Sequence, residues 1–211
     1  MSHEADEPGS PRLGARDALA IMTDARQRAR HELSASQSVL FATWGIAFLV
    51  SYGAVWLSVR GQRPYAGPGT AAIVTVFMVG AAAIAVTVVL IGRAASGVGG
   101  WSALQRRILL LSYVARYLAM FALEGALAEA GASRAVIGVF GAAAPLLVIG
   151  LACAAGSALR LSWPVFGIGV WLVVVAAASG YAGPAGVWGV DALAAGLAFL
   201  VMAGIRKVRA W

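Results

Sequence analysis

Residues 70–92 have the sequence TAAIVTVFMVGAAAIAVTVVLIG and contain no charged side chain over 23 positions. The hydrocarbon core of a bilayer is about 30 Å thick and takes about 20 helical residues to cross. The stretch therefore predicts a membrane-spanning helix. A transmembrane β-barrel would instead show short strands of alternating polarity.

Five more apolar blocks of similar length lie on either side of this stretch. They cover residues 39–59, 108–128, 135–155, 162–180 and 186–205. With residues 70–92 they predict an all-α, polytopic membrane helix bundle of six transmembrane helices. The connections within the first, second and third pairs are short, so we expect three antiparallel hairpins within a transmembrane domain at residues 39–205.

The overall composition is typical of an integral membrane protein. Of its 211 residues, 61% are hydrophobic and 12% are charged, whereas soluble domains carry about 25% charged residues. The net charge of +7 could suggest nucleic acid as a partner. However, the basic residues stand in short clusters between apolar blocks and match no recognition motif, so we expect no nucleic-acid binding.

The N-terminal segment differs from the rest of the chain. Residues 1–13 combine acids with Pro and Gly and predict a disordered tail. Residues 14–38 predict a charged helix on the cytoplasmic surface, where Asp24 and Arg28 can pair at i,i+4. A helix that docks a protein partner is the alternative for this segment. The leader does not resemble the start of a signal peptide.

Basic residues predict the orientation, because short cytoplasmic loops carry an excess of Lys and Arg. With the N-terminus inside, twelve of the sixteen basic residues lie on the cytoplasmic side and three lie outside, Arg116 being within a span. We expect a protein of the cell inner membrane with both termini cytoplasmic and a basic C-terminus at residues 206–211. The cytoplasmic Arg clusters could also contact anionic lipids.

Catalytic and cofactor motifs are not found in the sequence. The two histidines, His3 and His31, precede the first apolar block, and Cys153 is the single cysteine. No HExxH, GxSxG, P-loop or CxxC pattern occurs. We therefore predict no metal, no cofactor and no enzymatic activity.

Polar side chains nevertheless lie inside the predicted spans. At 100° per residue, one arc of the helix at 108–128 holds the residues Ser112, Tyr113, Arg116, Tyr117, Met120 and Glu124. In the last span, Asp191 should reach a depth similar to that of Glu124. The candidates for binding a ligand or an ion are Tyr113, Arg116, Tyr117, Glu124 and Asp191. The alternative is that these groups only hold helices together.

Small residues and one proline mark the later spans. Pairs at four-residue spacing, such as Gly138/Ala142, Ala152/Gly156 and Ala192/Gly196, let helix backbones approach closely. They predict tight packing or a homo-oligomer interface. Pro145 should kink the helix at 135–155, and such breaks can line a cavity.

Two segments carry a resemblance. WGIAFLVSYG (44–53) and AGLAFLVMAG (195–204) resemble segments of small, uncharacterised six-span membrane proteins of high-GC bacteria, a group that implies no activity. We expect a non-catalytic accessory or regulatory membrane subunit. The alternative is a transporter of a small solute, an ion or protons that uses the polar arc at 108–128.

Overall fold

The computed structural model describes residues 14–95, 101–160 and 162–208. These residues form the helices α1 (Ala15–Val59), α2 (Thr70–Ala95), α3 (Trp101–Glu129), α4 (Arg134–Arg160), α5 (Trp163–Ser179) and α6 (Gly183–Val208), with the short 3-10 helix η1 (Gly180–Ala182) before α6. The described part contains no strand, which confirms the all-helical prediction. The expected tail at 1–13 and the last three residues of the basic C-terminus lie outside the described residues.

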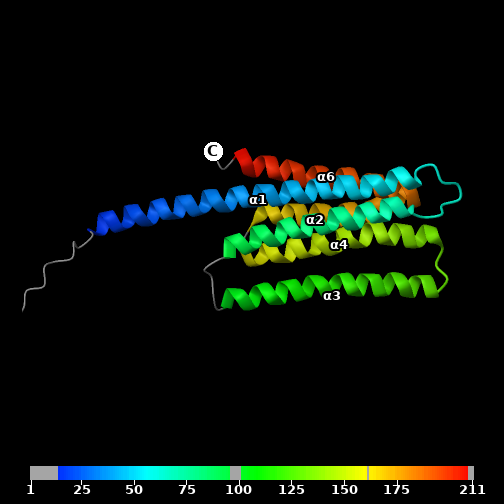
Figure 1. Ribbon diagram of the computed structural model, residues 1–211, viewed down its shortest axis with the longest axis horizontal. Coiled ribbons are helices and arrows are strands. Elements are labelled where there is room, and N and C mark those ends of the chain that lie inside the picture. The colour runs from blue at the N-terminus through cyan, green and yellow to red at the C-terminus, as the bar shows by residue number, and fades with distance from the viewer. Residues whose placement is uncertain (1–13, 96–100, 161, 209–211) are drawn as a thin grey trace, which may run out of the picture.

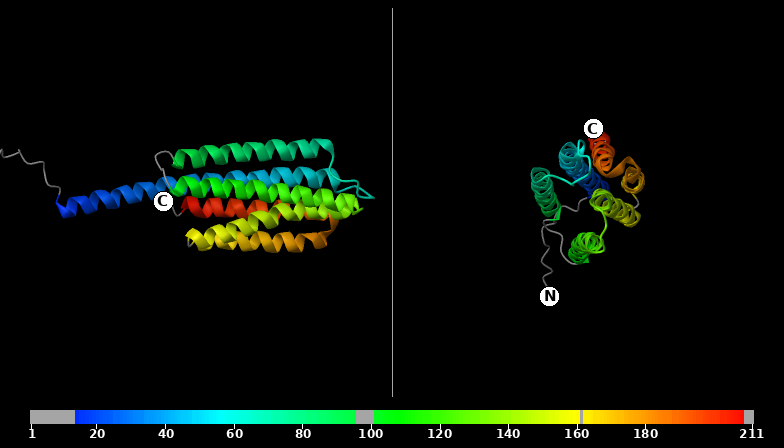
Figure 2. Two further views of the ribbon diagram at one scale, coloured as in Figure 1. Left: turned by 90° about the horizontal axis from the view of Figure 1, so that it is seen from below. Right: turned by 90° about the vertical axis from the view of Figure 1, so that its right-hand side faces the viewer.

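Four helical segments among the described residues are long and apolar enough to cross a membrane. They are Ser36–Val59, Thr70–Leu90, Arg134–Ser157 and Trp163–Val208. The last of these contains α5, η1 and α6, which form a hairpin in Figure 2. The chain is thus compatible with a membrane protein. The expected number of six spans is not confirmed by these segments.

The helices run side by side along one axis (Figure 1). The most extensive contacts join α1 to α6, α4 to α5 and α1 to α2, whereas α3 contacts α4 over a much smaller area. Seen end-on in Figure 2, α3 lies at the edge of the bundle. The closest helix pairs therefore include partners far apart in the sequence, which the expected hairpins alone do not provide.

Helix α1 runs without interruption from the N-terminal segment into the first apolar block. Its 45 residues correspond to about 68 Å at 1.5 Å per residue, and its first half extends beyond the other helices (Figure 1). A separate surface helix at 14–38 is therefore not confirmed. The physical reason is that no proline occurs in α1 and no glycine precedes Gly45, so nothing ends the helix before the apolar block.

The contact between α1 and α6 is here called the α1–α6 seam. It is formed by the residues Gly45, Phe48 and Leu49 of α1 and Gly196, Phe199 and Leu200 of α6. The Phe48 and Phe199 rings stack at 5.5 Å. A Cβ on Gly45 would meet Leu200 at 2.9 Å, and a Cβ on Gly196 would meet Leu49 at 2.5 Å. The two similar segments thus pack against each other reciprocally.

A second close approach joins α4 and α5. A Cβ on Gly169 would lie 2.5 Å from the backbone nitrogen of Ala154, and a Cβ on Gly150 would lie 2.8 Å from the carbonyl oxygen of Gly169. Glycine is therefore needed at both positions for the backbones to approach this closely. Gly156, predicted to pair with Ala152, meets no atom within 4 Å of its would-be Cβ.

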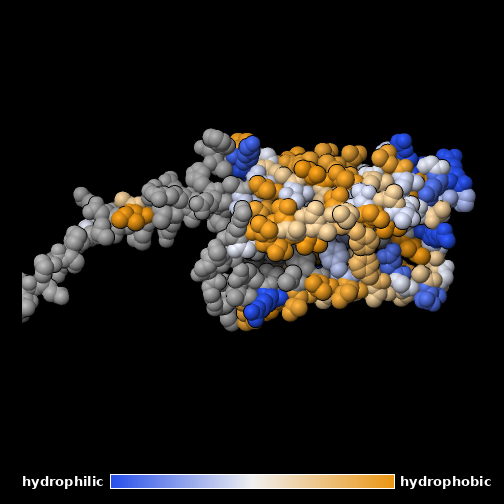
Figure 3. Space-filling model, in the orientation of Figure 1, coloured by the Kyte–Doolittle hydropathy of each residue, from blue (hydrophilic) through white to orange (hydrophobic). Residues whose placement is uncertain are grey.

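Apolar side chains cover the middle of the bundle, and hydrophilic residues gather at its two ends (Figure 3). Large apolar side chains of α2 and α3 are among the most exposed, including Phe77, Met78, Leu111 and Leu118. An apolar band between polar ends matches the cross-section of a bilayer.

Candidate functional site

The most unusual side chain of the described core is Asp191. It lies on α6, about 12 Å along the helix axis from Gly183, and its exposed fraction is 0%. Neither carboxylate oxygen has a hydrogen-bond partner among the described residues. Buried polar groups are nearly always paired, so an exception of this kind calls for a specific explanation.

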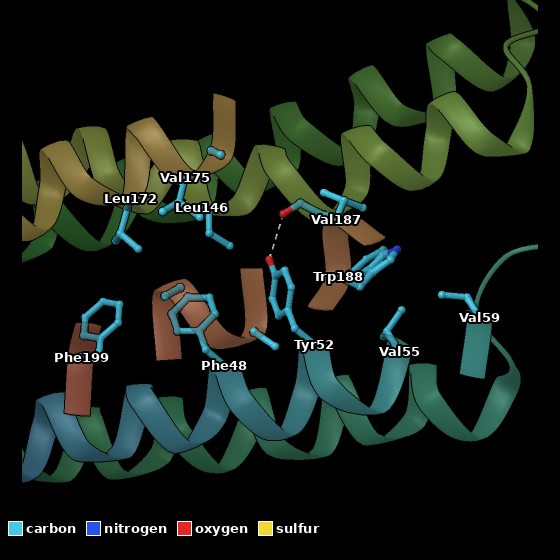
Figure 4. Packing of buried hydrophobic residues seen from close by; sticks show 14 of the residues in the cluster. Phe48, Tyr52, Val55, Val59, Leu146, Leu172, Val175, Val187, Trp188 and Phe199 are labelled. Atoms are coloured by element: carbon cyan, nitrogen blue, oxygen red, sulfur yellow. Dashed lines mark hydrogen bonds between the residues drawn. The ribbon is translucent and has the colours of Figure 1, made fainter. Parts of the chain in front are cut away.

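Tyr52 of α1 lies next to Asp191 and is close enough to interact with it electrostatically. Its hydroxyl donates to the carbonyl oxygen of Ala142 at 3.1 Å, the bond dashed in Figure 4. Its ring stands between Phe48 and Trp188, at centroid distances of 5.5 and 5.3 Å. These contacts hold Tyr52 across the bundle from α1 to α4.

The part of α4 that accepts this bond is shaped by Pro145, which lies inside the helix. Proline has no amide hydrogen, so the carbonyl of Gly141, four residues earlier, loses its helical donor. The Tyr52 bond reaches the next carbonyl, that of Ala142. On α3, Glu124 packs against the same turn, because a Cβ placed on Gly141 would lie 3.4 Å from its Oε1. Polar groups from two helices therefore meet α4 at its weakened turn.

Two further polar groups lie close to Asp191. Ser179 of α5 lies near the carboxylate, and its hydroxyl donates to the carbonyl of Ala176 over a long 3.4 Å. The indole Nε1 of Trp188 is buried without a partner among the described residues. Trp188 precedes Asp191 by three residues, so the two side chains share a face of α6.

The candidates on α3 lie farther out. The Arg116 side chain is exposed and Tyr117 is half-buried, and both take part in interactions within the protein. Tyr117 is also in electrostatic range of Tyr52. Glu124 is half-buried. Tyr113 lies on α3, but its side chain is outside the described part of the structure. No hydrogen bond joins Glu124 to Asp191, so the two carboxyl groups are not a hydrogen-bonded pair.

Tyr52, Ser179 and Trp188 are not among the site residues that the sequence predicts. A tryptophan near a span end, such as Trp188, is typical of the membrane interface, so its place in the core is not evident from the sequence. The i,i+3 spacing of Trp188 and Asp191 was the available signal. The described residues contain no group of three or more His, Cys, Asp or Glu side chains that could hold a metal ion.

Chemically, the Asp191 environment can bind a proton, because both carboxyl oxygens are buried acceptors without a partner among the described residues. No known protein family, no curated protein and no solved structure matches this chain. The interpretation therefore depends on the chemistry of the described residues alone.

Proposed function

We propose that this chain is a six-span protein of the cell inner membrane, with both termini in the cytoplasm, that serves as a non-catalytic accessory or regulatory subunit. The observation that carries this proposal is the unbroken helix α1. It joins a segment of membrane-crossing length, Ser36–Val59, to an N-terminal extension at 15–35 that projects beyond the bundle (Figure 2).

The extension is suited to protein binding. Leu19 and Ile21 are exposed by 60% and 57%. Because they are two residues apart, they point to nearly opposite sides of the helix, so each side offers an apolar side chain to a partner. Because the helix continues into the α1–α6 seam, a partner that tilts or rotates the extension would also act on the packing of the core. Regulation through a rigid element needs this kind of physical continuity.

The closed core also supports a non-catalytic role. Asp191 and Leu146 both have an exposed fraction of 0%, so a substrate could not reach the carboxyl group in this conformation. The exposed Lys207 near the C-terminal end of α6 fits a cytoplasmic position beside anionic lipid headgroups.

Site-specific photo-crosslinking in native membranes tests the accessory role. A photoreactive residue is placed at Leu19 or at Ile21, with Leu193 of α6, exposed by 60%, as the matched control. The proposal expects a discrete protein adduct from position 19 or position 21, depending on the side of the helix that the partner covers, and none from 193. Adducts of the same size from all three positions, or none from 19 and 21, would contradict it.

A transporter of protons, an ion or a small solute is the second candidate, favoured by the unpartnered carboxylate of Asp191. Purified protein in vesicles with an imposed pH gradient and an internal pH dye provides the test. Proton flux that is present in the wild type and lost in Asp191→Asn would favour transport over the accessory role.

A further inference from the structure

Asp191 is distinguished by its place in the sequence as well as by its burial. The other three aspartates of the chain are Asp6, Asp17 and Asp24, all before the first apolar block. A lone ionised carboxylate in an apolar core is very unfavourable, and such a group normally becomes neutral instead. Both oxygens of Asp191 lack a hydrogen-bond partner among the described residues, and the hydroxyl of nearby Ser179, which could stabilise a negative charge, donates to Ala176 instead.

The neighbours of Asp191 donate their hydrogens elsewhere. The titratable group that faces it is Tyr52 of α1, whose hydroxyl donates to Ala142 on α4. From α5, the Ser179 hydroxyl donates to Ala176, which leaves the lone pairs of its oxygen free to accept. Ala142 and Leu146 of α4 belong to the same buried apolar core as Tyr52. A carboxylate would attract these hydroxyl hydrogens, whereas a carboxylic acid would donate to one of these oxygens.

We propose that Asp191 is a proton-binding site in the core of the bundle, a carboxylic acid whose O–H is directed to Ser179 Oγ. The proton comes from water and returns to water, and no bond other than O–H forms or breaks. This arrangement gives the O–H of Asp191 an acceptor and leaves the bond from Tyr52 to Ala142 in place.

The site is placed where its protonation would affect the fold. Ser179 is the last residue of α5, directly before η1, and Asp191 is on α6, so the proposed bond ties the two helices across their connecting turn. Ionisation would draw water to the carboxylate and loosen α6 from α5 and α1. The inference does not depend on the accessory role and holds equally for a transporter.

Infrared spectroscopy of the full chain in lipid nanodiscs, titrated with pH, tests the proposal. A protonated carboxylic acid has a carbonyl stretch well separated from the carboxylate bands. We expect this band in the wild type, its loss on deprotonation at high pH, its absence in Asp191→Asn and its retention in Glu124→Gln. A carboxylate at every pH at which the protein is folded would overturn the proposal. Loss of the band on adding Na⁺ at constant pH would identify a cation site instead and overturn it equally.

A second variant covers the case in which Asp191→Asn does not fold. In the background Asp6→Asn, Asp17→Asn, Asp24→Asn, residue 191 is the sole aspartate. When aspartate is labelled with ¹³C at its side-chain carboxyl carbon, the carbonyl stretch of the protonated acid must then shift to lower frequency. A band that does not shift would assign the proton to Glu124 or another glutamate and contradict the inference.

Discussion

At the scale of single residues, the burial of the Asp191 carboxyl group is the most costly feature of this chain. A charged aspartate at the centre of a membrane helix costs about 2.5–3.5 kcal/mol on insertion scales. Asp191 is fully buried, and most side chains around it are apolar. Replacement of its few polar neighbours, above all Tyr52 and Ser179, should therefore change the stability of the bundle.

Removal of the Tyr52 hydroxyl should destabilise the bundle. In Tyr52→Phe the carbonyl of Ala142 loses the hydrogen bond of 3.1 Å, next to the turn that Pro145 already weakens. We expect a loss of about 0.5–1.5 kcal/mol of unfolding free energy, measured by thermal or denaturant unfolding in detergent. Tyr181→Phe is the control, because Tyr181 is 95% exposed. Equal stability of both variants would show that the Tyr52 bond contributes nothing.

Asp191 could be predicted from the sequence as a special residue, because a carboxylate within an apolar run is rare. Tyr52 could not. It stands among Phe48, Val55 and other apolar residues. The hydrogen-bond partner of its hydroxyl is the carbonyl of Ala142, 90 positions later in the sequence. Long-range pairing of this kind is set by helix packing, which leaves no local pattern.

At the scale of helices, the α1–α6 seam depends on two glycines with reciprocal contacts. Each glycine leaves room for a leucine of the opposite helix. Gly45 contacts Leu200, and Gly196 contacts Leu49. The four-residue spacing of Ala192 and Gly196 predicted close packing, and Gly196 does pack closely. The partner helix was not predictable, since α1 and α6 are the first and last helices of the chain.

Substitution of the seam glycines should separate α1 from α6. We expect Gly45→Ala and Gly196→Ala each to cost about 1–3 kcal/mol, because the added methyl overfills the contact. Gly53→Ala and Gly204→Ala are matched controls eight residues farther along each helix, where a Cβ meets nothing within 4 Å. They should be neutral or stabilising by roughly 0.5–1 kcal/mol, since alanine is the better helix former. Unfolding midpoints that do not separate the two pairs would refute this account of the seam.

At the scale of the whole molecule, composition predicted an all-helical chain with apolar helices of membrane-crossing length, and the structure agrees. The arrangement was less predictable. Positions of apolar blocks indicate which segments enter lipid, whereas α3 packs at the edge and α6 packs against α1. Lipid is as apolar as most of these side chains, so apolarity alone does not select helix neighbours.

The distribution of basic residues predicts the orientation, and cysteine accessibility can measure it. In a Cys153→Ala background, Ala66→Cys should react with a membrane-impermeant thiol reagent added outside intact cells. Ala20→Cys should react only after the membrane is opened. Both residues are exposed, so burial does not limit labelling. The reverse pattern of labelling would place residue 20 outside the cell and would contradict the predicted orientation.

The α1–α6 seam has a consequence for how copies of this chain can meet. The two helices are antiparallel, as the contacts of Ser38 with Ala203 at one end and of Trp56 with Gly189 at the other require. In a membrane where every copy inserts the same way, the α1 helices of two copies are parallel. One α1 therefore cannot take the place of α6 for another, although their GIAFLV and GLAFLV segments are nearly the same. Uniform insertion thus prevents mispairing, and a population inserted in both directions would lose that protection.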